Sequence, residues 1–134
     1  MAKSIYIHIP FCNNICSYCD FPKVLYDKKY IRKYLDTIKE EILERYQNEE
    51  VVSIYIGGGT PTSLDEEELK YLLEIISVFK KNNNIEFSIE SNIECLTNKK
   101  IKLFTHSFRG NRNLIRLRAV RRILYELHIL LMEE

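Results

Sequence analysis

Residues 4–21 read SIYIHIPFCNNICSYCDF. Apolar and polar residues alternate up to Ile9, which predicts a β-strand with isoleucines on one face and Tyr6 and His8 on the other. Pro10 has no backbone N–H to donate to a neighbouring strand, so we expect the strand to end there. A loop with three of the chain's four cysteines follows directly from the carboxyl end of this strand.

The cysteines of this loop, Cys12, Cys16 and Cys19, have the spacing C-x3-C-x2-C. Packing does not call for three thiols in one short loop, whereas thiolates so spaced can ligate one soft metal centre. An iron–sulfur cluster with one iron open to a small molecule uses all three. A zinc site with His8 or Cys95 as its fourth ligand is an alternative. We interpret Cys95, however, as a thiol that packs against its neighbours and not as a ligand. A thioredoxin-like dithiol would leave Cys12 without a role.

The sequence up to residue 104 alternates between strand and helix patterns. Further strands are expected at 51–56 and 85–90, and helices from 27 to about 46, from 63 to about 81 and from 97 to 104. Asp27 and Thr97 are the expected N-caps of the first and last helix. Ser63 with Glu66 predicts a capping box at the start of the middle helix. Asn82–Asn84 is the turn expected after it.

The order strand, helix, strand, helix, strand, helix predicts an α/β fold with a parallel sheet and right-handed crossovers. The strands are aliphatic on one face and polar or aromatic on the other, which favours a barrel whose aliphatic face lies under the helices. The side chains expected on the inner face are those of Tyr6, His8, Ser53, Tyr55, Ser88 and Glu90. Such units would form about half of a partial TIM-type barrel, with the functional site at the carboxyl ends of the strands.

A glycine-rich loop, Gly57–Pro61, follows the second expected strand and reads GGGTP. A flexible turn needs only one or two glycines, whereas three in a row let a ligand approach the backbone N–H and C=O groups. Glu90 ends the third strand on the same face as Tyr6. Its carboxylate is therefore a candidate acceptor for ribose hydroxyls or an ammonium group, the alternative being an ordinary solvated glutamate. We interpret His8 as a structural imidazole that bonds to a neighbour.

Composition limits the classes of function. The chain has 134 residues and a formal net charge of +1, so no field that attracts nucleic acid is expected. The N-terminus lacks the apolar segment of a signal peptide, and no apolar run approaches the roughly 18 residues of a membrane span. We therefore expect a cytoplasmic protein, in which clustered cysteines stay reduced and bind metal more often than they form disulfides.

Taken together, these motifs resemble the radical S-adenosylmethionine (SAM) superfamily. The cysteine spacing, with Tyr18 just before the third cysteine, is similar to its cluster motif, and the glycine-rich loop is similar to its methionine-binding loop. Three segments resemble the oxygen-independent coproporphyrinogen III oxidase group in order and spacing: YIHIPFC at 6–12, GGGTPT at 57–62 and IESN at 89–92. CDF at 19–21 resembles the haem-chaperone branch (HemW) of that group. The resemblance covers residues 4 to about 104.

The resemblance implies that Cys12, Cys16 and Cys19 ligate a 4Fe-4S cluster whose fourth iron is chelated by SAM. It implies SAM contacts from Tyr6, Tyr18, Gly58, Gly59, Thr60 and Glu90. In the family, an electron from the cluster cleaves SAM to methionine and a 5′-deoxyadenosyl radical, so an electron donor such as flavodoxin or ferredoxin is an implied partner. Porphyrin or haem is an implied partner of the full-length relatives.

The end of the chain departs from the family pattern. Residues 1–103 contain all 12 lysines and only two arginines, whereas residues 104–134 contain six arginines and no lysine. Leucines at helical spacing predict a helix over 111–132, and no strand pattern is evident where a fourth strand belongs. We expect residues 1–104 to be the N-terminal part of the barrel and residues 105–134 to be an atypical helical tail, the product of a truncated or frameshifted gene.

On this interpretation the isolated chain does not catalyse the family reaction, because the remaining strands and the substrate residues are missing. Two alternatives stay open. The chain could be a zinc-binding or electron-transferring iron–sulfur module, or it could be a non-functional fragment whose half-barrel leaves strand edges and apolar helix stripes uncovered.

Overall fold

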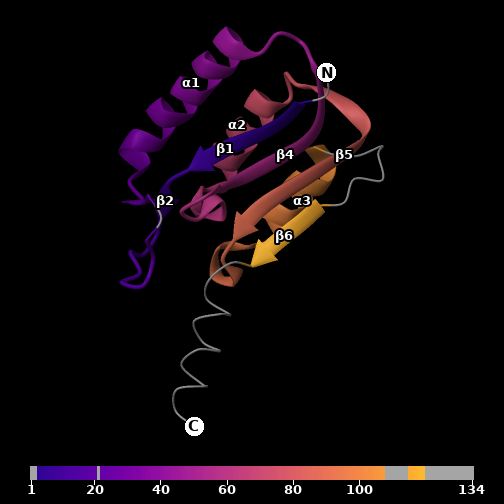
Figure 1. Ribbon diagram of the computed structural model, residues 1–134. Helices are drawn as coiled ribbons and strands as arrows, with labels where there is room; N and C mark the ends of the chain where they lie inside the picture. The colour runs from indigo at the N-terminus through magenta and orange to yellow at the C-terminus, as the bar shows by residue number, and fades with distance from the viewer. Residues whose placement is uncertain (1–2, 21, 108–114, 120–134) are drawn as a thin grey trace.

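The computed structural model describes residues 3–20, 22–107 and 115–119. It contains a four-stranded parallel sheet in the order β1-β4-β5-β6 (Figure 1). These strands are β1 (Lys3–Ile9), β4 (Glu50–Gly58), β5 (Lys80–Ser91) and β6 (Ile115–Ala119). A short parallel pair, β2 (Phe11–Cys12) and β3 (Val24–Leu25), extends from the end of β1. The predicted parallel α/β architecture is confirmed, here as an open sheet.

Three α-helices connect the strands in the described part of the chain: α1 (Lys28–Arg45), α2 (Glu66–Ile76) and α3 (Asn98–Ser107). They lie on one face of the sheet (Figure 1). The Asp27 carboxylate accepts a hydrogen bond from the Lys29 N–H at 3.0 Å, which confirms the expected N-cap of α1. The Thr97 hydroxyl likewise accepts a hydrogen bond from the Lys100 N–H at 3.2 Å at the start of α3.

The hydrophobic core lies between these helices and the aliphatic face of the sheet. Ile9, Ile56 and Ile89 from the strands and Leu35 and Leu72 from the helices are all fully buried within it. Burying one such side chain contributes about 1.5–3 kcal/mol, so these positions determine which face of each strand turns toward the helices. The predicted division of the strands into an aliphatic face and a polar face is therefore confirmed.

The connection between α2 and β5 differs from the prediction. α2 ends at Ile76 and β5 begins at Lys80, so the turn expected at Asn82–Asn84 is wrong. A register shift in the pairing of β4 with β5 leaves these asparagines outside the ladder, as a bulge within the strand. Within the bulge, the Asn84 N–H donates to the Asn82 side chain at 2.8 Å. The turn-forming residues thus satisfy their own backbone locally without ending the strand.

The capping box of α2 also differs from the prediction, which placed it at Ser63 and Glu66. The Asp65 carboxylate accepts the Glu68 N–H at 2.8 Å, and the Glu68 carboxylate accepts the Asp65 N–H at 2.8 Å. Both pairs have the required spacing, so the sequence pattern alone does not separate them. Ser63 ends the 3₁₀ turn η1 (Pro61–Ser63), where its hydroxyl donates to the Phe11 carbonyl at 3.2 Å.

The predicted helix over 111–132 is wrong for the residues that the structure describes there. Residues 115–119 form β6, a fourth strand that pairs in parallel with β5 from Phe87–Ile115 to Ser91–Ala119. The segment reads IRLRA, a short alternation of apolar and charged residues that suits a strand. Pairing with the edge of β5 overrides the helical spacing of the leucines. The remainder of the expected tail lies outside the described residues.

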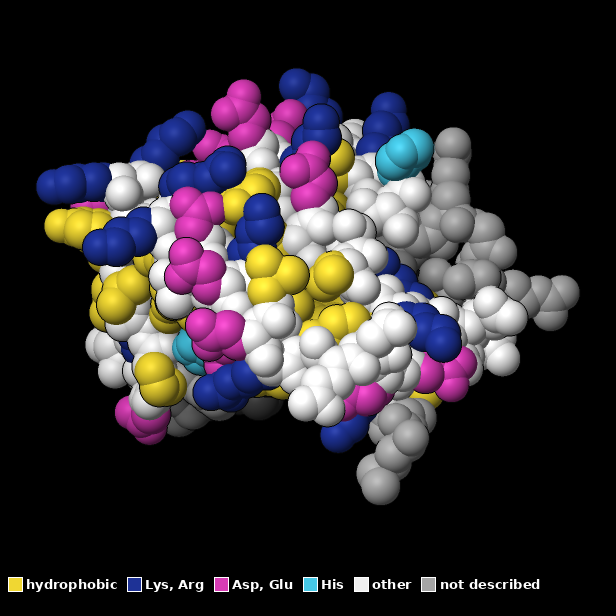
Figure 2. Space-filling view, turned by 90° about the horizontal axis from the view of Figure 1, so that it is seen from above, with side chains coloured by type: hydrophobic (Ala, Val, Ile, Leu, Met, Phe, Trp, Pro, Cys, Tyr) yellow, Lys and Arg dark blue, Asp and Glu magenta, His cyan; other side chains and the backbone are white. Residues whose placement is uncertain are grey.

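The molecular surface mixes charges of both signs. Figure 2 shows acidic and basic side chains interspersed on the face seen from above. Ion pairs among the described residues include Lys28–Asp65 at 2.9 Å and Arg45–Glu41 at 3.0 Å. Such interspersion gives that face no extended field of one sign. Among the described residues, no helix is both long and apolar enough to cross a membrane.

Replacement of Asp65 tests the position of the capping box. We expect Asp65→Ala to lower the free energy of unfolding by about 1 kcal/mol, because the Glu68 N–H loses its acceptor. Glu66→Ala is the matched control, since Glu66 lies 3.8 Å from Lys99 in an exposed pair. Such pairs contribute only about 0–1 kcal/mol. Urea denaturation measures both, and an equal loss in the two variants would contradict the assignment.

The contribution of Asp65 should also depend on pH. Burial opposes ionisation of this carboxyl, but hydrogen bonds from the Glu68 N–H and Lys28 outweigh burial and lower its pKa below 3.8. A lowered pKa means that the stabilisation is complete at neutral pH and is lost as the pH falls below that ordinary value. The difference in unfolding free energy between wild type and Asp65→Ala should therefore shrink in acid, as measured by urea denaturation at several pH values.

Candidate cofactor site

The cysteine-containing loop leaves the sheet and returns close to its starting point. The short strands β2 and β3 pair in parallel at its two ends. The Val24 N–H donates to the Pro10 carbonyl at 2.9 Å, and the Tyr26 N–H donates to the Cys12 carbonyl at 2.7 Å. The Tyr26 hydroxyl then donates to the Glu68 carboxylate on α2 at 3.0 Å. The two ends of the loop are therefore joined to each other by backbone hydrogen bonds, and the second end is also bonded to α2.

The three cysteines of the loop differ in how firmly they are held. All are free thiols; Cys12 is buried, and Cys16 and Cys19 are half-buried. The Cys12 Sγ lies 3.6 Å from the Thr60 hydroxyl, with which it forms a hydrogen bond. Cys19 donates its N–H to the Cys16 carbonyl at 3.2 Å, which forms a turn, and its own carbonyl accepts a hydrogen bond from Lys23. The thiols do not converge into a metal-binding group in the described part of the chain.

The glycine-rich loop is hydrogen-bonded to the start of the cysteine loop. The Gly59 N–H donates to the Ile9 carbonyl at 2.8 Å, and the Thr60 N–H donates to the Phe11 carbonyl at 2.8 Å. These bonds continue the pairing of β1 with β4 beyond the end of the sheet. The two motifs that are far apart in the sequence thus form one continuous backbone structure at the carboxyl ends of the strands.

The contact between the two loops is too close for any side chain. A Cβ atom on Gly59 would lie 2.6 Å from the Pro10 carbonyl oxygen and 2.8 Å from the Cys12 Sγ. A Cβ atom on Gly58 would lie 2.6 Å from the Ile9 carbonyl oxygen, and Gly58 has a φ of +124°, which disfavours other residues. Two of the three glycines therefore have a packing requirement that the sequence alone did not reveal.

Glu90 lies beside this loop on the polar face of the sheet. Its carboxylate accepts hydrogen bonds from the Gly58 N–H at 3.1 Å and the Tyr55 hydroxyl at 2.5 Å. The Tyr55 ring stacks on the Tyr6 ring with 5.8 Å between centroids. A Cβ atom on Gly57 would lie 2.7 Å from the Tyr55 ring, 3.2 Å from the Tyr6 ring and 3.3 Å from the Glu90 carboxyl carbon. The three side chains therefore converge above Gly57.

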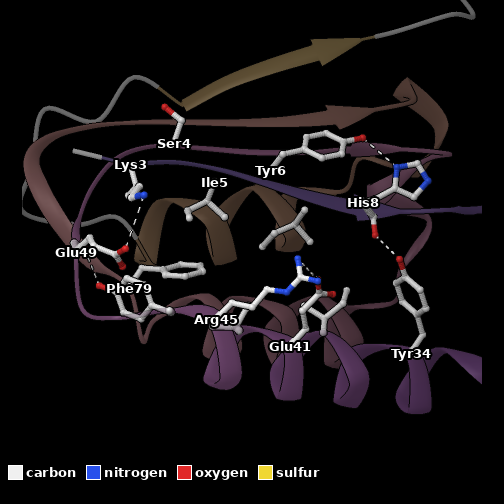
Figure 3. A pocket seen from close by; sticks show the side chains of 14 residues that line it. Lys3, Ser4, Ile5, Tyr6, His8, Tyr34, Glu41, Arg45, Glu49 and Phe79 are labelled. Carbon is white, nitrogen blue, oxygen red and sulfur yellow. Dashed lines mark hydrogen bonds and ion pairs between the residues drawn. The ribbon is translucent and has the colours of Figure 1, made fainter. Parts of the chain in front are cut away.

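Tyr6 extends this polar cluster to the outer edge of β1. Its hydroxyl lies 3.0 Å from the His8 Nδ1, within hydrogen-bond distance, and the His8 carbonyl accepts a hydrogen bond from Tyr34 on α1 at 2.6 Å (Figure 3). Burial and the negative charge of Glu90 raise the pKa of Tyr6 above 10.0. The raised pKa favours the protonated phenol, which can donate a hydrogen bond to the His8 Nδ1. The contact with a neighbouring side chain that was expected for His8 is present, and its structural role stays a prediction.

The segment after β5 closes the site on the other side. The Asn92 side chain donates to the Thr60 hydroxyl at 3.3 Å, and that hydroxyl is the same one that contacts Cys12. Beyond it, the Asn13 side chain donates to the Cys95 Sγ at 3.5 Å. Burial raises the pKa of the Cys95 thiol. Cys95 is therefore a half-buried, hydrogen-bonded thiol beside the loop that carries the cysteine motif.

The structure brings most of the predicted site residues together. Tyr6, Gly58 and Glu90 form one connected group, and Gly59, Thr60 and Cys12 form a second group on the same loop. Tyr18 differs, because it is 44% exposed on the cysteine loop. Tyr55 and Asn92 contact site residues but were not predicted as such. Strand parity placed Tyr55 beside Glu90, and this signal could have identified it.

Comparison with known proteins identifies the family. The family model described as the radical SAM superfamily matches residues 6–123, which includes every site residue named above. The chain belongs to the radical SAM superfamily. The match continues past residue 104 and through β6, beyond the segments that carry the sequence resemblance.

Curated relatives include members of two groups. The haem chaperone HemW of Bacillus subtilis is 42% identical over 106 residues, which is 75% of this chain and 28% of that protein. The HemW of Lactococcus lactis is 40% identical and matches 78% of this chain and 28% of its own length. The oxygen-independent coproporphyrinogen III oxidase of Mannheimia haemolytica is 38% identical over 65% of this chain and 63% of its own sequence.

A solved structure shares the fold. Coproporphyrinogen III oxidase (HemN) from Escherichia coli, described as a radical SAM enzyme, matches with a TM-score of 0.71 and 25% sequence identity. The match covers 92% of this chain and 30% of that enzyme. The chain therefore spans less than a third of the length of the HemW proteins and of this enzyme.

The donor atoms at the site fit the cofactors of a radical SAM protein. Three free thiols within eight residues supply the soft sulfur ligands of an iron–sulfur cluster, and Cys12 lies directly against the glycine-rich loop. That loop and Glu90 supply hard oxygen acceptors a short distance away. Sulfur donors on one side and oxygen acceptors on the other match a cluster beside a ligand that carries an ammonium group.

Alanine substitutions should rank the glycines by what their Cβ atoms meet. Gly59→Ala places a Cβ against backbone oxygen, which cannot move without separating the two loops, so we expect a loss of about 1–3 kcal/mol in unfolding free energy. Gly57→Ala is the matched control, since its Cβ meets side-chain atoms of Tyr55, Tyr6 and Glu90 and no backbone atom among its nearest contacts. Chemical denaturation measures both. A smaller loss for Gly59→Ala than for Gly57→Ala would contradict the close backbone contact.

Proposed function

We propose that the chain forms the cluster-binding and SAM-binding part of a radical SAM protein of the haem-chaperone or coproporphyrinogen III oxidase-like type. Cys12, Cys16 and Cys19 are the proposed ligands of a 4Fe-4S cluster. The proposed SAM contacts are Tyr6, Tyr18, Gly58, Gly59, Thr60 and Glu90. The observation that carries the proposal is the direct packing of the cysteine loop on the glycine-rich loop, beside the Glu90 carboxylate.

The hydrogen bonding of the glycine-rich loop supports a ligand that donates hydrogen bonds. The N–H groups of Gly58, Gly59 and Thr60 all donate within the protein, to Glu90, Ile9 and Phe11. A loop that cradles a phosphate would instead direct its N–H groups at the ligand. The negatively charged carboxylate of Glu90, beside the loop, is an acceptor that suits the amino group of SAM.

Tyr6 supports the same assignment. The residue is 58% exposed, and its ring lies beside the Glu90 carboxylate and is held by stacking on Tyr55. Aromatic faces attract cations, and the sulfonium and ammonium groups of SAM are both positively charged. An exposed ring next to a carboxylate therefore offers two attractive groups to one cationic ligand.

The chemistry supplied by the bound cofactors is reductive cleavage of SAM to methionine and a 5′-deoxyadenosyl radical. The residues of this chain bind the two cofactors and orient them. The cysteine ligands must be deprotonated, and the Thr60 hydroxyl can donate to the Cys12 thiolate from 3.6 Å. Cys16 and Cys19 lie on an exposed loop that a reducing protein of the flavodoxin or ferredoxin class could approach. Action on haem or a porphyrin is proposed only for a protein that also contains the regions of the longer relatives that this chain does not match.

A second candidate function is a simple metal or electron-transfer module. It is favoured by Cys16 and Cys19, which are half-buried and supply thiol ligands whether or not a second ligand binds beside them. Such a module needs no ligand at the glycine-rich loop. Binding of SAM therefore separates the two candidates, because only a radical SAM site should respond to it.

Anaerobic reconstitution with iron and sulfide tests the cluster. We expect about four iron atoms per chain in the wild type. Serine substitution at Cys12, Cys16 or Cys19 should lower the iron content strongly, because each removes one thiolate. Cys95→Ser is the matched control and should keep it. Iron and sulfide analysis gives the answer; a colourless protein that binds one zinc ion per chain would exclude the cluster.

Electron paramagnetic resonance (EPR) of the reduced cluster tests SAM binding. We expect added SAM to shift the signal of the wild type, and Glu90→Gln to weaken SAM binding at least about tenfold, because the ammonium group loses its charged acceptor. Glu86→Gln on the same strand is the matched control, since Glu86 is exposed away from the loop. A cluster signal that SAM leaves unchanged in the wild type would favour the electron-transfer module.

A further inference from the structure

Lys100 is a buried cation that the proposed function does not use. It lies in the first turns of α3 and is only 9% exposed, whereas its neighbours Lys99 and Lys102 are exposed. Its Nζ donates to the Thr62 carbonyl at 2.7 Å and to the Cys95 carbonyl at 3.1 Å. Within the described residues it forms no ion pair with a carboxylate. Two backbone carbonyls therefore hold a buried ammonium group.

These carbonyls belong to two different loops. Thr62 lies in η1, directly after the glycine-rich loop, and Cys95 ends η2 (Ile93–Cys95), which follows β5. The ammonium group is thus a bridge between two connections that follow neighbouring strands. The Thr62 and Ser91 hydroxyls also pair, at 2.8 Å. That bond involves only neutral groups, whereas the bonds from Lys100 are charge-assisted and therefore stronger.

Both loops contribute to the cofactor site. Thr60 on the first loop contacts the Cys12 thiol, and Asn92 on the second loop donates to the same Thr60 hydroxyl. The separation of the two loops therefore determines where Thr60 lies relative to Cys12. A buried ammonium group without a carboxylate is costly unless its donors are satisfied, so Lys100 favours the one arrangement in which both carbonyls are within reach.

We propose that Lys100 is a positioning residue of the cofactor site, whose ammonium group joins η1, directly after the glycine-rich loop, to the loop after β5 through the Thr62 and Cys95 carbonyls. The proposal rests on the proposed function only in so far as the positioned site binds SAM. The bridge itself is a property of the chain without cofactors. The existence of the bridge and its effect on SAM binding can therefore be tested separately.

Amide hydrogen exchange of the full chain tests the bridge without any cofactor. We expect Lys100→Met to speed exchange about tenfold at the amides of Gly59, Thr60 and Cys95, the change for losing one charge-assisted hydrogen bond. Amides of β1 and β4 within the sheet, which ends before Gly59, should keep wild-type rates. Lys99→Met is the matched control and should change neither set. Unchanged exchange at the loop amides, or an equal increase throughout the chain, overturns the proposal.

Titration of the reconstituted protein with SAM, followed by EPR, tests the consequence for the site. We expect Lys100→Met to weaken SAM binding about tenfold at unchanged iron content, and Lys100→Arg to recover part of the loss because it keeps a cationic donor. Equal SAM affinity in Lys100→Met and wild type overturns the positioning role. If SAM leaves the EPR signal of the wild type unchanged, the proposed function is refuted. The hydrogen-exchange measurement still shows whether Lys100 joins the two loops.

A variant that does not fold is replaced by a milder one. If Lys100→Met does not fold, both measurements are made on Lys100→Gln, which keeps a neutral, shorter donor. Faster exchange confined to the two loops, together with weaker SAM binding, supports the proposal. Exchange rates and SAM affinity equal to wild type in Lys100→Gln overturn it.

Discussion

Gly58 and Gly59 pass so close to the chain between Ile9 and Cys12 that no side chain fits between them. This contact holds the two loops of the site in one position, and backbone hydrogen bonds from Gly59 and Thr60 strengthen it. It depends on the parallel pairing of β1 with β4, which brings both strands to the same edge of the sheet. The hydrophobic core fixes that pairing in turn, because Ile9 and Ile56 must face the helices.

Sequence patterns predicted the features that follow from local periodicity. Alternation in β1 and β5 placed Tyr6, His8 and Glu90 on the polar face, and the cysteine and glycine motifs were expected at the carboxyl ends of strands. These inferences needed only the period of a strand and the direction of a parallel sheet. The same information did not show that the glycines are required for packing, since that requirement involves a segment nearly fifty residues away.

The predictions that were wrong concern segments whose sequence pattern is compatible with two local structures. Only tertiary contacts decide which of the two forms. Ser63 and Asp65 both precede a glutamate at capping-box spacing, and the contact of Ser63 with Phe11 decides between them. Residues 115–119 combine an apolar–charged alternation with a leucine at helical spacing, and pairing with the edge of β5 selects the strand. Lys100 is one of several lysines on an amphipathic helix, so its burial could not be read from the pattern.

The close contact of Gly58 and Gly59 with the segment between Ile9 and Cys12 couples the two halves of the candidate site. Cys12 and Glu90 approach the glycine-rich loop from different elements, and that loop is anchored to β1, to β5 and to α3. A cluster on Cys12 and a ligand at Glu90 would therefore be held at a separation set by a few backbone bonds. Reactions that transfer an electron to a bound molecule benefit from such fixed placement, because the reacting groups need not search for each other. Gly58 and Gly59 meet this demand, since a side chain on either would push the glycine-rich loop away from the segment between Ile9 and Cys12.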